Sequence, residues 1–295
     1  MRKKTLTVVL CQTRESELTY NSLRKNVLKP LKSDLAFCGS SQQDDTHDDI
    51  LLKKSRYVWN FDEPLDWGQA CDQISTREGN WRDLARLSKA FLGGTGYQDS
   101  VGSGIIIMYW REVLRVCLTK KILDSYEWFV ITRSDFYWEI EHPKIKLLDA
   151  DQIYFLDGEK YGGLSDRHII FHRKYADRIL KIAEPIFKDS KELGKKLQNS
   201  QIDNLNPEQY LNYIFKEFNL LQHVTFIPYL GYTIRQAQTS TRWSKGVFND
   251  ELGLFVKYPE EYRMVKENLL EFKTPTQWKT FFDMQKRTDL NPCSE

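Results

Sequence analysis

The chain has 295 residues, which is long enough to bury one large hydrophobic core or two smaller ones. Hydrophobic residues make up 41% of it and charged residues 28%, a composition that excludes an intrinsically disordered protein. The 43 basic and 41 acidic residues leave a net charge of only +2. A dedicated nucleic-acid-binding protein would carry a strong positive excess, so no nucleic-acid partner is expected.

The cysteines and the N-terminal residues bear on location. The 5 cysteines are an odd number without a Cys-x-x-Cys pair, so we expect reduced thiols rather than disulfides or a zinc site. The basic start MRKK precedes an apolar run, LTVVLC, that is too short for a signal peptide or a membrane span. These features predict a cytoplasmic protein. Its basic stretches near both ends would suit peripheral contact with the inner face of a membrane.

Residues 5–38 predict a strand, a helix and a second strand. The apolar run 5–11 ends at Gln12-Thr13-Arg14, and residues 17–31 carry leucines at helical spacing. The sequence DLAFC at 34–38 is the next short strand. This order is typical of a parallel sheet with a right-handed crossover.

Two polar segments follow. Residues 40–49, SSQQDDTHDD, predict a solvated loop rather than a metal site, because no apolar framework flanks them to fix ligand geometry. Residues 93–104, GGTGYQDSVGSG, fit neither a P-loop nor a dinucleotide-binding fingerprint. They precede a helix predicted at 104–123. An anion could bind at the start of that helix, and a plain surface loop is the alternative.

The remaining elements continue the alternation of strands and helices. Residues 188–207 are polar without apolar periodicity and predict an exposed loop or hairpin. The alternation predicts an α/β fold around one mostly parallel central sheet flanked by helices. The strands are expected at 128–132, 152–156 and 168–172, with an extended segment at 224–236; the helices are expected after 172, at 207–218 and in a tail at 258–286, where Trp278, Phe281 and Phe282 can pack back.

Polar side chains follow two of the predicted strands. Gln12 and Arg14 come after the first strand, and Arg133 and Asp135 come after the strand at 128–132. Ligands of open parallel sheets bind beyond the carboxyl ends of the strands. An arginine suits a phosphate, and a carboxylate suits a divalent cation beside it. The alternative is that Arg133 and Asp135 only pair with each other or cap a turn.

A second cluster lies at 161–168, YGGLSDRH. Its paired glycines allow a tight turn or a close approach of backbones. They present Asp166, which could act as a general base toward a hydroxyl group. The alternative is an Asx turn in which the Asp166 side chain binds its own backbone.

Several stretches together resemble bacterial and viral polysaccharide glycosyltransferases of the GT-A type. The resemblance spans roughly residues 5–240, and its most specific parts are TRSD at 132–135 and GGLSDRH at 162–168. It implies a GT-A-like, Rossmann-type domain at 1–240. A mostly helical extension at 241–295 would pack on the same domain.

The resemblance also implies roles for individual residues. Gln12, Arg14, Arg133 and Asp135 would bind the nucleotide-sugar donor, together with Arg235 at the end of the 224–236 segment. Asp135 would hold a divalent cation, Mn²⁺ or Mg²⁺, although Tyr137 stands where a second acidic residue is usual. Asp166 would be the catalytic base, and the acceptor would contact Tyr161, Gly163 and Arg167.

The predicted activity is transfer of a sugar from a nucleotide-diphosphate sugar to a hydroxyl of a glycan or lipid-linked glycan acceptor. There are two alternatives to this activity. A sugar nucleotidyltransferase usually has a Gly-rich loop after its first strand, where this chain reads QTRESE without a glycine. The other alternative is a non-catalytic carbohydrate-binding or scaffold protein.

Overall fold

The computed structural model describes residues 4–41, 49–76, 81–87, 92, 101–158, 160–199, 205–239, 244–272 and 274–289. The acidic segment at 42–48 and the Gly-rich residues 93–100 lie outside the described residues. The predictions of a solvated loop and of an anion-binding loop at those positions therefore stay predictions.

The described part of the chain forms a seven-stranded central sheet with the order β3-β2-β1-β4-β7-β6-β8. Only β7 runs antiparallel to its neighbours β4 and β6. Leu6, Val8 and Leu10 of β1 are buried on one face of the sheet and Val9 on the other, as expected for a strand covered on both sides. The strands are β1 (Thr5–Gln12), β2 (Ser33–Ser40), β3 (Tyr57–Asn60), β4 (Trp128–Thr132), β6 (Ile153–Asp157), β7 (His168–His172) and β8 (Val224–Pro228).

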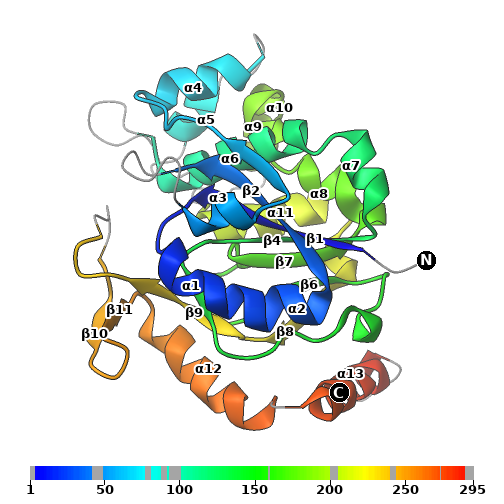
Figure 1. The fold of residues 1–295 in the computed structure, drawn as a ribbon. Coiled ribbons are helices and arrows are strands. Elements are labelled where there is room, and N and C mark those ends of the chain that lie inside the picture. The colour runs from blue at the N-terminus through cyan, green and yellow to red at the C-terminus, as the bar shows by residue number, and fades with distance from the viewer. Residues whose placement is uncertain are drawn as a thin grey trace.

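Helices cover both faces of this sheet (Figure 1). One face packs against α6 (Ser103–Cys117), α8 (Ala176–Leu180), α9 (Glu184–Phe187), α10 (Ser190–Asn199) and α11 (Pro207–Glu217). The other packs against α1 (Ser16–Leu23), α12 (Pro259–Glu271) and α13 (Pro275–Asp289). The predicted α/β fold with a mostly parallel sheet flanked by helices is thus confirmed. Shorter helices are α2 (Lys29–Leu31), reached through a π-helical turn at Arg24–Leu28, and α3 (Ile50–Lys54), α4 (Trp67–Ile74), α5 (Trp81–Leu87) and α7 (Lys120–Ser125).

A second, antiparallel sheet has the order β10-β11-β9-β5. Its strands are β5 (Phe136–Trp138), β9 (Gly231–Arg235), β10 (Val247–Asn249) and β11 (Leu254–Val256). Three residues separate the end of β4 from the start of β5. Strand β5 pairs with β9 from Phe136 opposite Thr233 to Trp138 opposite Gly231. This pairing joins the stretch after β4 to the C-terminal part of the chain. The tail helix α13 packs back as predicted, with Trp278 and Phe282 buried.

One predicted element is wrong. Residues 190–199 form helix α10 and not an exposed loop or hairpin. The helix buries Leu193 and Leu197, which lie one turn apart, while its other positions are mostly charged or polar. Two apolar residues are too few to produce a visible helical period, so the sequence alone favoured a loop.

The described residues include four of the five cysteines. Cys11, Cys38, Cys71 and Cys117 are free, and Cys293 lies outside the described residues. Within those same residues, none of the helices combines the length and the apolar character needed to cross a bilayer.

Candidate active site

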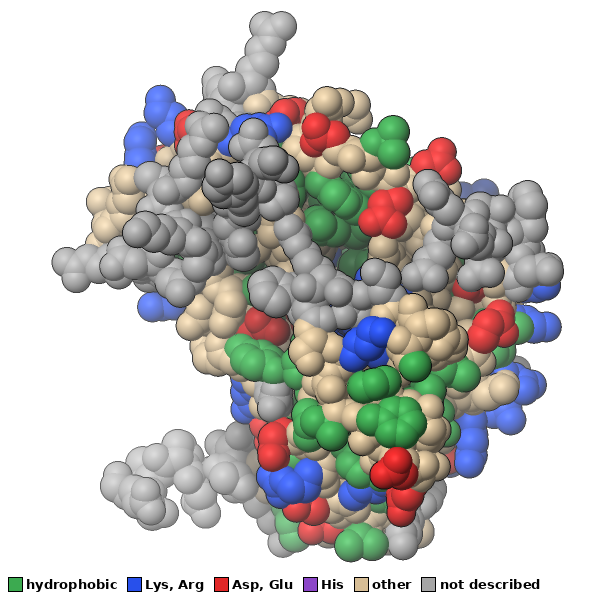
Figure 2. Space-filling model, turned by 90° about the vertical axis from the view of Figure 1, so that its left-hand side faces the viewer, with side chains coloured by type: hydrophobic (Ala, Val, Ile, Leu, Met, Phe, Trp, Pro, Cys, Tyr) green, Lys and Arg blue, Asp and Glu red, His purple; other side chains and the backbone are tan. Residues whose placement is uncertain are grey.

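A cavity of about 1290 Å³ opens at the edge of the central sheet where β1 and β4 end. Figure 2 views the molecule from this side, where hydrophobic and charged side chains lie close together. The carboxyl edge of an open parallel sheet is the expected place for a ligand. The structure brings most of the predicted site residues to this one cavity: Gln12, Arg14, Arg133, Asp135, Tyr161, Asp166 and Arg167 all line it.

The end of β1 has an unusual backbone. Cys11 has a φ of 91°, in the left-handed region that residues with a side chain rarely adopt. Its carbonyl oxygen lies against β2 at Gly39, where an added Cβ would be only 1.7 Å from it. Only glycine fits there. The Ser134 hydroxyl donates to the carbonyl of Gln12 at 2.5 Å, so the residues after β4 fix the end of β1.

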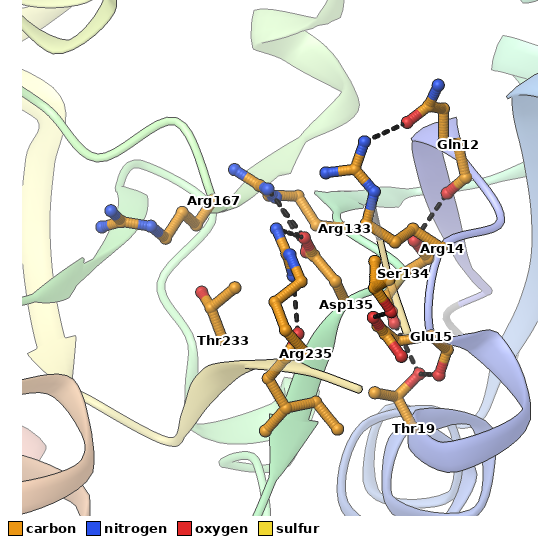
Figure 3. Close-up of polar contacts among 12 residues, drawn as sticks. Gln12, Arg14, Glu15, Thr19, Arg133, Ser134, Asp135, Arg167, Thr233 and Arg235 are labelled. Atoms are coloured by element: carbon orange, nitrogen blue, oxygen red, sulfur yellow. Dashed lines mark hydrogen bonds and ion pairs between the residues drawn. The ribbon is translucent and has the colours of Figure 1, made fainter. Parts of the chain in front are cut away.

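The side chains that follow β1 bind each other. Arg14 Nη2 donates to Gln12 Oε1 at 2.6 Å (Figure 3), and Gln12 Nε2 donates to Glu63 Oε2 at 2.9 Å. Burial lowers the pKa of Arg14, because desolvation disfavours the charged form and the negative charge of Asp135 opposes this only in part. The two residues therefore present a partly desolvated cation to the cavity.

Asp135 is a buried carboxylate bound by two arginines (Figure 3). Arg133 donates from Nε to Oδ1 at 2.9 Å and from Nη2 to Oδ2 at 2.8 Å, which is the bidentate geometry. Arg235 Nη2 lies 2.6 Å from Oδ2. Burial alone would raise the pKa of Asp135, but the charges of Arg133 and Arg235 hold it well below its ordinary value. Asp135 is therefore ionised at neutral pH.

Arg235 does not contact the cavity directly. Its side chain is fully buried and is not among the described residues that line the cavity. Its Nη1 donates to the carbonyl of Ile234 at 2.6 Å, and the Ile234 amide donates to the carbonyl of Asp135 at 3.0 Å. The predicted donor-site arginine thus acts on the site through Asp135 and does not reach a ligand itself.

The described residues do not fit a resident divalent cation at Asp135. Both oxygens of this carboxylate already accept hydrogen bonds or ion pairs from guanidinium groups. Among the described residues, no group of three or more His, Cys, Asp and Glu side chains is placed to hold a metal ion. His168 is fully buried and packs on Trp138, with ring centroids 4.9 Å apart. The sequence prediction of a metal at Asp135 is therefore not supported by the surroundings of this residue.

The turn at 161–167 packs on the start of helix α11. The Leu164 amide donates to the carbonyl of Glu208 at 3.0 Å, and Asn206 Nδ2 donates to the carbonyl of Tyr161 at 2.9 Å. Gly163 lies so close to the backbone of α11 that a Cβ added to it would be 2.0 Å from the carbonyl oxygen of Glu208. Gly163 is not one of the described cavity-lining residues, and its function is this close approach of two backbones.

This packing brings two carboxyl groups to the same cavity. Asp166 from the turn and Glu208 from α11 both line it. Burial and the negative charge of Asp166 raise the pKa of Glu208 to about 7. Sequence analysis missed Glu208, because Asn206-Pro207-Glu208-Gln209 indicates only the start of a helix, as its capping box confirms. The residues around Glu208 in the sequence do not indicate that Asp166 lines the same cavity.

Arg167, predicted to bind the acceptor, is held by neighbouring side chains. Its Nη1 lies 3.1 Å from Glu261 Oε1 and donates to the Tyr229 hydroxyl at 3.1 Å. Its guanidinium also lies 4.5 Å from the centre of the Tyr258 ring. Figure 3 shows that it extends away from Asp135. Arg167 fixes the turn against α12, whereas Tyr161 is 44% exposed at the cavity.

Two further cations were not predicted. Arg111 of α6 lines the cavity with only 4% exposure, beside the apolar side chains of Ile106, Ile107 and Trp110. The signal in the sequence is an arginine on the face of the helix that is otherwise apolar. Lys257, next to β11, also lines the cavity, and burial and the charges of Arg133 and Arg235 lower its pKa to about 8. Its position depends on the pairing of β11 with β9.

The fold is thus an α/β fold with a polar cavity at the carboxyl edge of its sheet. Its cavity combines arginines that can bind an anion with two carboxyl groups that can move a proton. The model is similar to the structure of mouse xyloside xylosyltransferase 1 in its apo form, with a TM-score of 0.43 and 12% sequence identity over 76% of this chain and 84% of that one. Neither the family models nor the curated protein sequences contain a match to the chain.

Proposed function

We propose that the protein is a glycosyltransferase that moves a sugar from a nucleotide-diphosphate sugar to a hydroxyl of a glycan or lipid-linked glycan acceptor. The observation that carries this proposal is the composition of one cavity. Arg14 and Arg133 line it from the ends of β1 and β4, and Asp166 and Glu208 line it from the turn and α11. Sugar transfer needs both kinds of group, a cation for the leaving diphosphate and a base for the acceptor hydroxyl.

The arginines are assigned to the leaving group. As the bond between the anomeric carbon and the diphosphate oxygen breaks, negative charge grows on that oxygen. Guanidinium groups in a partly buried site stabilise this charge more than water does, because they are already oriented. Asp135 keeps Arg133 in place through two hydrogen bonds.

Asp166 is assigned as the base. In a single displacement the acceptor oxygen attacks the anomeric carbon from the face opposite the diphosphate. A new glycosidic bond forms, the nucleoside diphosphate leaves, and the acceptor proton passes to the Asp166 carboxylate. Tyr161, exposed at the cavity, presents a ring on which an acceptor sugar can stack.

The test combines binding with turnover. UDP-, GDP-, dTDP- and CMP-sugars are screened for a rise in melting temperature, because a ligand of the native state stabilises it by mass action. The donor found is then incubated with glycan acceptors, and release of the nucleotide is measured. Asp166→Asn is expected to keep the thermal shift and to lose about 10²- to 10⁴-fold in release rate. The exposed Asp177→Asn on α8 is the matched control and should behave as wild type.

Two results would contradict the proposal. One is that no nucleotide sugar raises the melting temperature. The other is that Asp166→Asn retains the full rate of nucleotide release. If the protein is instead a carbohydrate-binding or scaffold protein, glycans alone are expected to raise its melting temperature. Asp166→Asn would then leave that rise unchanged.

A further inference from the structure

Arg111 is a buried cation that lines the cavity. Its side chain is 4% exposed, and its Nε and Nη1 atoms have no hydrogen-bond partner among the described residues. Burial lowers the pKa of its guanidinium, and the negative charge of Asp166 opposes this only in part. Buried N–H groups of a guanidinium that lack an acceptor are strongly unfavourable, so such groups are expected where a ligand supplies the acceptor.

A second arginine in the same cavity also has an unused donor. Nε of Arg14 is buried without a partner, again among the described residues, and its Nη2 donates to an uncharged amide oxygen, that of Gln12. Arg133 also lines the cavity, and its contacts with Asp135 use Nε and Nη2. The N–H groups that remain point to an anion with many acceptor oxygens.

Asp135 cannot accept a metal without losing these contacts. A divalent cation at its carboxylate would displace Arg133, Arg235 or both, and would lie beside their positive charges. The same carboxylate is therefore suited to orienting Arg133 and not to binding an ion that bridges to phosphate.

We propose that Arg111 is a phosphate-binding residue and that the diphosphate is neutralised by Arg111, Arg14 and Arg133 without a divalent cation. The identity of the ligand as a nucleoside diphosphate rests on the proposed glycosyltransferase function. The anion site itself does not, because the unpaired donors of Arg111 and Arg14 define it whatever else the ligand carries.

The test measures binding of inorganic pyrophosphate, UDP and GDP by isothermal titration calorimetry, in EDTA and again in Mg²⁺ or Mn²⁺. The expected result is binding in EDTA, with a Kd within about threefold of the value in metal. Binding that appears only with metal, or that metal strengthens tenfold or more, would overturn the inference and leave the glycosyltransferase proposal standing. Pyrophosphate binding in EDTA without binding of any nucleotide would support the anion site and contradict the glycosyltransferase proposal.

Three variants of helix α6 sharpen the test. Arg111→Gln is expected to weaken pyrophosphate and nucleotide binding tenfold or more and to leave the melting temperature of the unliganded protein unchanged or higher, because an unpaired buried charge is removed. Arg111→Lys should restore part of the affinity. Arg115→Gln, one turn further along, removes an arginine that pairs with Glu112 at 2.7 Å and should leave affinity unchanged. If Arg111→Gln binds pyrophosphate as tightly as wild type, or if it lowers the melting temperature like a structural residue, the inference is overturned.

Discussion

Arg235 reaches Asp135 from the neighbouring strand of the second sheet, with Nη2 2.6 Å from Oδ2 and both side chains almost completely buried. The contact joins two positions 100 residues apart in the sequence. Because Arg133, whose side chain is 26% exposed, binds the same carboxylate, two cations share one almost completely buried anion. Removing the anion would leave the buried Arg235 guanidinium without its carboxylate partner.

Asp135→Asn is therefore expected to destabilise the protein by about 3–5 kcal/mol, the usual cost of breaking a buried pair from one side. The ionised Asp135 also contributes stability that is present above its unfolded-state pKa and is lost as pH falls toward its depressed folded-state pKa. Urea unfolding at pH 7 and pH 3 measures both effects. The exposed Asp124→Asn on α7 is the control. Equal stability of the two variants at pH 7 would contradict the shared-anion interpretation.

The buried pair of Arg167 and Glu261 is expected to couple strongly. Each of Arg167→Met and Glu261→Met should cost about 3–5 kcal/mol, because each removes the opposite charge that its buried partner contacts. The double variant should cost about 1–3 kcal/mol less than the sum. The exposed pair of Arg263 and Glu267 on α12 is the control and should show no measurable coupling. If the double variant costs as much as the two single variants together, the contact between Arg167 and Glu261 contributes no coupling energy.

Glu208 is expected to make stability depend on pH near neutrality. Its pKa of about 7 lies above its ordinary value of 4.5, so between these two values the folded protein binds more protons than the unfolded chain. Stability therefore falls as pH rises through this window. Glu208→Gln should remove the fall and be more stable than wild type at pH 8 by roughly 1–3 kcal/mol. Unfolding free energies of both proteins from pH 5 to pH 8 test this, and parallel curves would argue against it.

Lys257 is expected to take up a proton when a diphosphate binds. Its pKa of about 8 leaves it mostly neutral at pH 8.5, and a nearby anion favours the charged form. Calorimetry of UDP or pyrophosphate binding at pH 8.5, in buffers of different ionisation enthalpy, measures the protons bound. The uptake should disappear in Lys257→Met and persist in Lys191→Met, whose lysine is exposed on α10. The same uptake in wild type and Lys257→Met would assign the proton to another group.

The sequence predicts the fold well wherever a buried strand appears as an unbroken apolar run. The runs at 5–11 and 128–132 are β1 and β4, and the polar residues that follow them meet at one cavity, as the rule for parallel sheets requires. The short helix α10 escaped prediction because its two buried leucines stand among charged residues. The spacing of apolar residues is too weak a signal to predict a helix when so few of its side chains are buried.

The site was predicted only where its residues follow a strand or form a turn. The sequence neighbours of Glu208 and Lys257 give no sign of the cavity, and the sign of Arg111 is only its place on an otherwise apolar helix face. Arg235 and Arg167 were predicted from the sequence to bind the donor and the acceptor, and both form buried ion pairs within the protein. Their carboxylate partners, Asp135 and Glu261, lie far along the chain, and only the fold shows that these charges are already paired.

The second sheet also decides when the site can form during synthesis. The Thr239 hydroxyl donates to Glu15 across 224 residues of sequence, and Arg235 reaches back to the residue just after β4. A nascent chain that ends before β9 has Arg14 and Arg133 but lacks the strand that holds Asp135 in register. Contacts of such long sequence separation form late and slowly. We therefore expect the nascent chain to bind no phosphate until β9 and β11 have left the ribosome.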